Sequence, residues 1–290
     1  MSLVTFTLVF IAAVLHATWN LIAKRAASAG AAFVFAYRLA STVLYAPWVI
    51  YVLLTESTSW SWTVVGFIFL SSVIHLCYGL CLQRGYQVAD LSVVYPIARG
   101  TGPLLSSIGA YIWLFEEPST HGVLGMACVV GGVLLIATQA QWRLFARPQA
   151  WVGVRWGLLI GLFIACYTLV DAYSVKDLHV SPVLLDWLGA LSITLMMAPG
   201  AWMKRTQLVQ QMRGKWGLAF AVGAISPMGY ILVLYALQHG AQVSLVAPLR
   251  EMSLMIATLA GFFLLKEKVS PARAGGCAVI ITGVVLLSSR

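Results

Sequence analysis

Charged residues are scarce in this 290-residue sequence. Asp, Glu, Lys and Arg make up only 9% of it, whereas soluble globular proteins carry about 25%. Hydrophobic residues make up 61%, and the mean hydropathy is +0.90. So little charge excludes a water-soluble fold, because a soluble protein of this length has far more polar surface. A chain surrounded by lipid needs an apolar exterior, so the composition predicts an integral membrane protein.

Cysteine is also rare, and sequence motifs for catalysis are missing. The five Cys residues all fall inside apolar stretches, which predicts small buried side chains and no disulfide framework. Cys77 and Cys81 are four residues apart, but no further Cys or His completes a zinc site, so we expect no metal. There is no P-loop, H-E-x-x-H, G-x-S-x-G or dinucleotide fingerprint. These absences predict a protein that is not an enzyme and needs no cofactor.

Long apolar runs, in contrast, are abundant. A helix needs about 20 mostly apolar residues to cross roughly 30 Å of hydrocarbon. The first run has no basic segment before it and no cleavage site after it, so we interpret it as a span and not a signal peptide. Ten runs qualify, at about 3–23, 31–54, 63–83, 91–113, 121–138, 152–174, 181–200, 216–237, 243–265 and 272–289. We predict an all-α integral membrane protein with ten transmembrane helices.

The two halves of the sequence resemble each other. Motifs recur in the same order in residues 92–136 and 244–287. Four pairs match in register: Pro96 with Pro248, Arg99 with Arg250 across a one-residue gap, Glu116 with Glu267, and Gly132 with Gly283. We therefore predict two five-helix repeats, 1–140 and 152–290. Because five is odd, the second repeat must enter the membrane inverted relative to the first, around a shared central cavity.

Basic residues are distributed unequally between the two faces of this predicted topology. Of the 18 Lys and Arg residues, 13 fall on one face, two on the other and three inside spans. The positive-inside rule makes the 13-residue face cytoplasmic. We predict a multi-pass protein of the cell inner membrane with both termini in the periplasm. The same distribution explains the net charge of +9 without a nucleic-acid partner.

Charges inside the predicted spans indicate a site, because a charge at mid-bilayer costs at least ~2.5–3.5 kcal/mol. Arg99 shares a helix face with Tyr95, and it is either a substrate anchor or a structural Arg tied to a neighbouring carboxylate or carbonyl. Glu251 is either a proton-titratable or amine-binding group or the partner of Arg250 or Arg38 in an ion pair that fixes packing.

Other polar and aromatic positions recur at helical spacing and could line a cavity. A histidine inside a span is equally explained by a hydrogen bond between helices. The candidate substrate-binding residues are His16, Trp19, Asn20, His75, Tyr78, Tyr95, Arg99, Tyr167, Tyr230, Arg250 and Glu251. The candidate gate or packing residues are Arg38, Asp171 and Asp186.

In its ten spans and its repeated motifs, the sequence resembles the EamA family of the drug/metabolite transporter superfamily. The features that carry the resemblance are Arg38, Pro96 with Arg99, the Glu116 and Glu267 motifs, and the Gly-rich fifth and tenth spans. The resemblance implies two inverted bundles around a central cavity and a secondary carrier, and known members export amino acids. Known ten-span members are usually described with cytoplasmic termini, whereas the charge distribution here predicts periplasmic ones.

These observations together predict a secondary transporter of small metabolites, an exporter working by alternating access. Charges of both signs and aromatic walls suit a zwitterion, so amino acids are the expected cargo. A proton is a candidate coupling ion, and lipid surrounds the chain. One alternative cargo is a phosphorylated or phosphonate metabolite or a cationic drug. Another alternative, an intramembrane enzyme acting on a lipid-linked substrate, needs an acid/base or nucleophile set that the sequence lacks.

Overall fold

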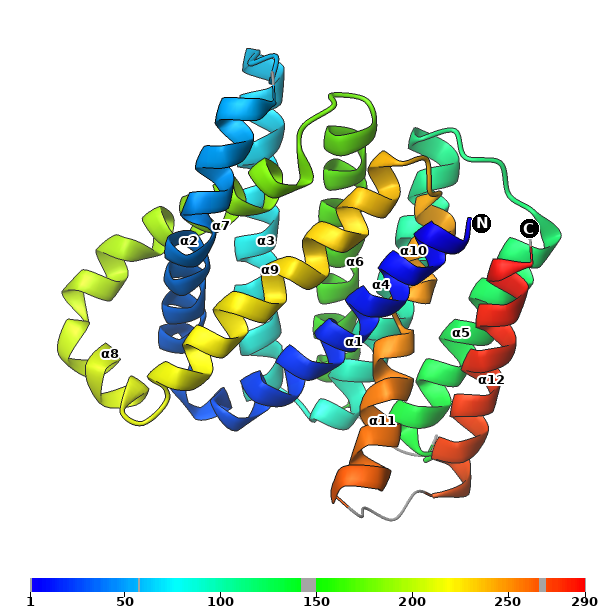
Figure 1. Ribbon diagram of the computed structural model, residues 1–290. Helices are drawn as coiled ribbons and strands as arrows, with labels where there is room; N and C mark the ends of the chain where they lie inside the picture. The colour runs from blue at the N-terminus through cyan, green and yellow to red at the C-terminus, as the bar shows by residue number, and fades with distance from the viewer. Residues whose placement is uncertain (1, 57, 142–149, 266–269, 290) are drawn as a thin grey trace.

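The computed structural model is helical throughout the part of the chain that it describes (Figure 1). The described residues are 2–56, 58–141, 150–265 and 270–289. Predictions for Glu267 and for the basic residues Arg143, Arg147, Lys266 and Lys268 lie outside these ranges.

The helices follow the predicted spans closely, and most boundaries differ by only a few residues. In the first half they are α1 (Leu3–Arg25), the short 3₁₀ turn η1 (Ala27–Ala29), α2 (Gly30–Thr55), α3 (Trp62–Val88), α4 (Leu91–Trp113) and α5 (Thr120–Thr138). In the second half they are α6 (Ala150–Lys176), α7 (Pro182–Met203), α8 (Arg205–Met212), α9 (Trp216–Gln238), α10 (Val243–Leu249), α11 (Met252–Leu265) and α12 (Pro271–Ser288). The short helix α8 was not predicted.

Eight of the described helices are long and apolar enough to cross a membrane: α1, α2, α3, α5, α6, α7, α9 and α12. This result confirms an all-helical chain with membrane-spanning character. The predicted spans 91–113 and 243–265 do not meet the same criteria. The first forms α4, which contains Arg99 and two prolines, and the second is broken into α10 and α11. The total of ten spans therefore stays a prediction, and a continuous helix over 243–265 was wrong.

Serine side chains begin several helices. Ser119 accepts a hydrogen bond from the backbone N–H of Gly122 at 3.0 Å and so caps α5. Ser270 accepts one from the N–H of Arg273 at 3.4 Å and caps α12. A serine at this position satisfies a backbone donor that the first turn of a helix leaves free. The last helix of each half thus starts in the same way.

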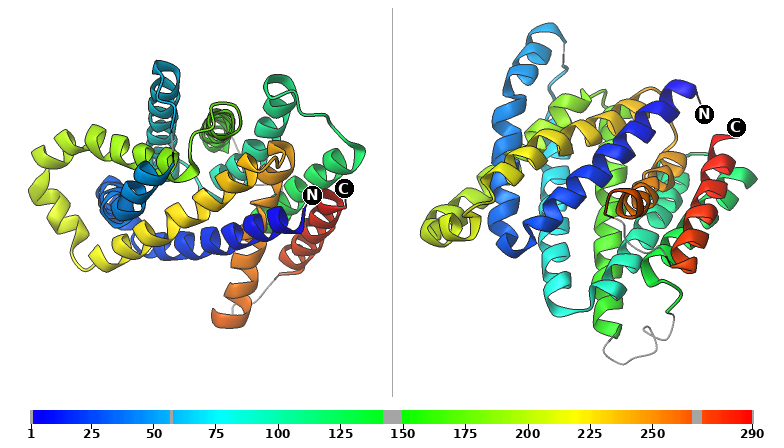
Figure 2. Two further views of the ribbon diagram at one scale, coloured as in Figure 1. Left: turned by 45° about the horizontal axis from the view of Figure 1, so that its top comes forward. Right: turned by 60° about the horizontal axis from the view of Figure 1, so that its bottom comes forward.

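Helices from the two halves pack together in exchanged pairs. Helix α1 packs against α9, and α6 packs against α3; α2 packs against α7, and α5 packs against α12. Figure 1 shows α5 and α12 side by side, away from α2, α7 and α8. The N- and C-termini lie close together in the views of Figure 2. The core is therefore built between the halves as well as within each half.

Four glycines bring α5 and α12 into close contact. A Cβ atom at Gly132 would lie 2.7 Å from the carbonyl oxygen of Gly276, and one at Gly276 would lie 2.9 Å from that of Gly132. Gly125 and Gly283 face each other in the same way, at 2.9 and 2.7 Å. Small residues at such crossings let two helix backbones approach closely in a membrane. Any larger side chain would push these helices apart.

Candidate functional site

The candidate site lies where the chain breaks between α10 and α11. Pro248 near the end of α10 has no backbone N–H, and the chain continues through short-range bonds from Glu251 N–H to the Pro248 carbonyl at 2.9 Å and from Ser253 N–H to the Arg250 carbonyl at 3.1 Å. Such a 3₁₀-like stretch within a helix often marks a functional hinge. The break turns Arg250 and Glu251 toward α4 and α6.

Arg99 on α4 forms the central ion pair of this site. Its Nε lies 2.9 Å from Oε2 of Glu251, and both side chains are largely buried. Its Nη2 donates to Ser253 Oγ at 3.0 Å, and its Nη1 lies 3.4 Å from Nε2 of His16 on α1. The guanidinium also faces the Tyr95 ring, 5.8 Å from its centroid. Glu251 is therefore paired with Arg99, and the predicted alternatives of a pair with Arg250 or Arg38 were wrong.

Arg250 has a different environment. Its Nη2 donates to the hydroxyl of Tyr167 on α6 at 3.4 Å, and no carboxylate of the described residues forms an ion pair with it. The Arg250–Tyr167 contact repeats the Arg99–His16 contact in the other half. The same number of residues separates Arg99 from Arg250 as separates His16 from Tyr167. Arg250 is thus a partly buried cation that is free to bind an anionic group.

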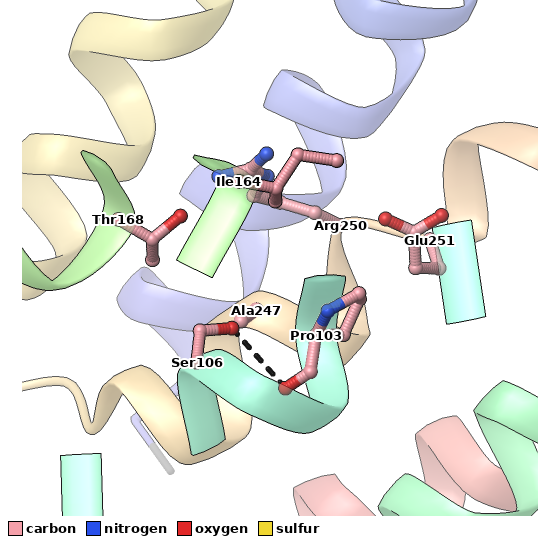
Figure 3. A pocket seen from close by; sticks show the side chains of 7 residues that line it. All are labelled: Pro103, Ser106, Ile164, Thr168, Ala247, Arg250 and Glu251. Atoms are coloured by element: carbon pink, nitrogen blue, oxygen red, sulfur yellow. Dashed lines mark hydrogen bonds between the residues drawn. The ribbon is translucent and has the colours of Figure 1, made fainter. Parts of the chain in front are cut away.

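A small hollow, with room for about one water molecule, lies beside this cation. Figure 3 shows Arg250 and Glu251 at the break, with side chains of α4 and α6 around them. The full lining is Pro103, Ser106, Ile164, Thr168, Ala247, Arg250 and Glu251. Ligand pockets usually measure about 300–1,000 Å³. The wall therefore combines both signs of charge with two hydroxyl groups, but the hollow is small and its helices must part to admit a metabolite.

A second polar cluster surrounds Asp171 on α6. Oδ2 of Asp171 lies 3.0 Å from Nε2 of His75 on α3 and also accepts a short hydrogen bond from the hydroxyl of Tyr230 on α9. The His75 ring stacks on Tyr167, with 4.1 Å between the ring centroids, and Tyr78 meets Tyr167 edge-on at 5.6 Å. Asp171 was predicted as a gate or packing residue, and the structure places it at the centre of an aromatic cluster of predicted site residues.

The remaining predicted residues lie at the edges of these two clusters. Asn20 is exposed, and its side-chain N–H donates to the His16 carbonyl of its own helix at 2.7 Å. Trp19 packs edge-on against His16 at 5.0 Å. Arg38 lies over the Tyr37 ring at 5.4 Å and close enough to Asp186 to interact electrostatically. Among the described residues no group of three or more His, Cys, Asp or Glu side chains could hold a metal.

Sequence reasoning missed two polar members of the site. Ser253 accepts from Arg99, and Thr168 lines the hollow with a buried hydroxyl that has no hydrogen-bond partner. Both are single small hydroxyl residues in apolar helices, where most serines and threonines bond to their own backbone, so the sequence distinguishes them poorly. The signal was available for Ser253, which follows two charged residues at a proline break.

An all-helical bundle with apolar walls and a buried, charged centre is typical of multi-pass membrane proteins that move small molecules. Residues 151–289 match the EamA-like transporter family, and this match confirms the family resemblance and the transporter class that the sequence predicted. A known transporter family also confirms that the chain is not an enzyme.

Several known proteins are similar to this chain. An uncharacterized transporter of Bacillus subtilis (strain 168), YwfM, is 23% identical over 250 residues, which cover 86% of this chain and 80% of YwfM. The multidrug resistance protein EbrA of Bacillus licheniformis is 32% identical over 69 residues, which cover 23% of this chain and 66% of EbrA. One crystal structure matches with a TM-score of 0.76 at 15% identity, covering 98% of this chain and 96% of that one. That likeness shows a shared fold.

Proposed function

We propose that this protein is a secondary carrier that exports amino acids by alternating access. The main observation in support of the proposal is that groups of both charge signs lie around the hollow. Arg250 is a partly buried cation without a carboxylate ion pair among the described residues. The acid Glu251 and the hydroxyls of Ser106 and Thr168 lie around the same space. A zwitterion offers the matching groups.

The residues in and around the hollow offer a binding partner for each group of an amino acid. The guanidinium of Arg250 can bind a carboxylate through two parallel hydrogen bonds. The hydroxyls of Ser106 and Thr168 accept hydrogen bonds from an ammonium group. Ile164 and the ring of Tyr167 offer an apolar surface for a side chain. Because Glu251 is neutralised by Arg99, the centre keeps one excess positive charge, which favours a carboxylate.

Three regularities support two inverted repeats, 1–140 and 152–290, around this centre. Helix contacts exchange between the halves. The contact between Arg99 and His16 recurs between Arg250 and Tyr167. Ser119 and Ser270 cap the last helix of each half in the same way. Inverted repeats of this kind let one bundle rock against the other around a fixed site.

The size of the hollow supports a moving carrier. A space that holds about one water molecule is too small for a metabolite, so cargo enters only when the helices around the hollow separate. The break at Arg250 and Glu251 supplies a hinge beside the site. We place the protein in the cell inner membrane, with both termini in the periplasm because the basic loops then lie in the cytoplasm.

Purified protein in liposomes tests the proposal. Liposomes loaded with a mixture of radiolabelled amino acids should release at least one of them faster than protein-free liposomes. Arg250→Gln should abolish this flux because it removes the carboxylate partner. Arg213→Gln, at an exposed position outside the hollow, should leave the flux unchanged. No protein-dependent flux of any amino acid would refute the proposal.

Organic cations are a second candidate cargo, favoured by the similarity to EbrA, a multidrug resistance protein. A cation would use Glu251 and would not need Arg250. In the same liposomes, flux of a lipophilic cation that is lost in Glu251→Gln but kept in Arg250→Gln would identify this cargo class in place of amino acids.

A further inference from the structure

The acids Asp171, Asp186 and Glu251 lie inside the bundle, and Asp171 differs from the other two. Glu251 is held by Arg99 at 2.9 Å, and Asp186 has Arg38 nearby. Asp171 is 1% exposed, and its ionic partner is His75. The ionic partner of Asp171 is therefore an imidazole, which can exist with or without a proton, whereas an arginine side chain keeps its charge. A buried carboxylate without a permanent cation is costly, which favours a shared proton.

Groups on every helix that packs against α6 face this acid or lie close to it. His75 and Tyr78 come from α3, and Tyr230 comes from α9. Asp186 of α7 lies within electrostatic range. On the side of α4 and α10 the charged groups are Arg99 and Arg250. Neither arginine bonds to Asp171, so the pair of His75 and Asp171 keeps its own proton balance.

The pair lies directly beside the hollow. Tyr167 contacts both regions: its ring stacks on His75 at 4.1 Å, and its hydroxyl accepts from Arg250 at 3.4 Å. Thr168, whose hydroxyl lines the hollow without a partner, lies one helical turn before Asp171 on the same side of α6. Oδ1 of Asp171 also has no hydrogen-bond partner. Two unsatisfied oxygens on α6 thus mark a place for a donor group.

We propose that His75 and Asp171 form a proton-binding site that exchanges its proton for the ammonium group of the cargo. This inference rests on the proposed function. With the proton absent, the negative Asp171 and the positive Arg250 present two opposite charges that match a zwitterion. With the proton bound, the negative end is lost and cargo binds more weakly. Proton and cargo therefore occupy the carrier alternately, and an inward proton gradient drives cargo outward.

The test uses liposomes containing the full-length protein and the labelled amino acid with the highest flux. The membrane potential is clamped with potassium and valinomycin, and pyranine reports the internal pH. At one-for-one exchange, a gradient of about one pH unit should support up to about a tenfold cargo gradient, which equals 1.4 kcal/mol. The wild type should couple cargo efflux to internal acidification. Asp171→Asn should lose this coupling. Because the variant resembles the protonated state, it should exchange labelled for unlabelled cargo without a gradient only at a higher cargo concentration than the wild type.

The controls separate this site from its neighbours. Asp177→Asn replaces an exposed acid just beyond the end of the same helix and should keep full coupling. His75→Gln keeps a hydrogen bond to Asp171 but cannot carry the proton, so it should also uncouple, and it serves if Asp171→Asn does not fold. Retained coupling in both variants, or loss of coupling in Glu251→Gln alone, would overturn the inference.

Two further outcomes separate the inference from the proposed function. Wild-type exchange of cargo that is insensitive to the proton gradient would refute the inference and leave the amino-acid carrier intact. The absence of any cargo exchange in the wild type would refute the carrier. In that case infrared spectra of the cargo-free protein still test the pair of His75 and Asp171. The band of the protonated Asp171 carboxyl group should be present in the wild type and absent in Asp171→Asn.

Discussion

The ion pair of Arg99 and Glu251 is a structural element of the site. Its atoms lie 2.9 Å apart, and both side chains are largely buried. Removing one partner of a buried pair leaves an uncompensated charge and costs about 3–5 kcal/mol. We expect Arg99→Gln and Glu251→Gln each to lower the free energy of unfolding by about 3 kcal/mol. Replacing both should cost much less than the sum, as a double-mutant cycle of denaturant unfolding would measure.

Additive losses in that cycle would contradict the pairing. Ser253→Ala provides a smaller reference, because it removes one hydrogen bond from Arg99 and leaves the ion pair. A hydrogen bond to a charged group contributes about 1.5–3 kcal/mol. The loss of unfolding free energy in Ser253→Ala should therefore be equal to or smaller than the loss in Arg99→Gln or Glu251→Gln.

Glu116 holds the start of α10 through its carboxylate. It accepts hydrogen bonds from the backbone N–H groups of Val243 and Ser244 at 2.6 and 2.9 Å and from the Ser244 hydroxyl at 2.7 Å. We expect Glu116→Ala to lower the melting temperature strongly and to reduce transport, because it loosens the helix that precedes the break. Lys176→Met should have a smaller effect, because it removes only the longer contacts to Glu116 Oε1 at 3.3 Å and to the Ala241 carbonyl at 3.4 Å. Equal melting temperatures for the two variants would contradict this role.

At the scale of elements, α5 and α12 depend on glycine where they cross. A Cβ atom at Gly132 would lie 2.6 Å from Ile280 Cγ1 and 2.7 Å from the Gly276 carbonyl oxygen. We expect Gly132→Ala to lower the free energy of unfolding by about 1–3 kcal/mol through overpacking. The matched control is Gly131→Ala on the same helix, where a Cβ meets nothing within 4 Å. Thermal unfolding in detergent should separate the two variants, and similar curves would contradict the close crossing.

Most element boundaries could be predicted from the sequence, because each long apolar run has only one stable form in lipid. The break between α10 and α11 was the exception. Hydropathy over 243–265 favours a single span, although Pro248 and the adjacent charges signal an interruption. The interruption is stable because Glu116, from the other half of the chain, satisfies the backbone donors at the start of α10. A contact between such distant residues has no local signal.

The candidate site was predictable by residue type and only partly by partner. Charge inside an apolar span identified Arg99, Arg250 and Glu251, and the structure brings all three to one break. Which arginine holds Glu251 depends on how α4 packs beside the break, and helical spacing contains no such information. The position of Asn20 could not be predicted for a related reason, because a polar residue in a span can also bond to its own helix and face outward, as Asn20 does.

At the scale of the whole molecule, the exchanged helix contacts give a prediction of topology. Two halves that pack through α5 against α12 and α2 against α7 match a two-fold arrangement in which equivalent positions face opposite sides. Ser28 and His179 are equivalent under the register that relates Arg99 to Arg250, and both are exposed. Ser28 lies in a loop region rich in basic residues, so it should face the cytoplasm, whereas His179 should face the periplasm.

Cysteine labelling in intact cells checks this topology without reference to any cargo. All five native Cys residues are replaced first, and then Ser28→Cys and His179→Cys are made separately. A membrane-impermeant maleimide should label the His179→Cys protein in intact cells and the Ser28→Cys protein only after the membrane is opened. Labelling of both from the same side would contradict the inverted repeat, and with it the rocking of two halves around Arg250. The opposite assignment of sides would keep the repeat and place the termini in the cytoplasm. The experiment therefore tests the inverted repeat separately from the side of the membrane on which the termini lie.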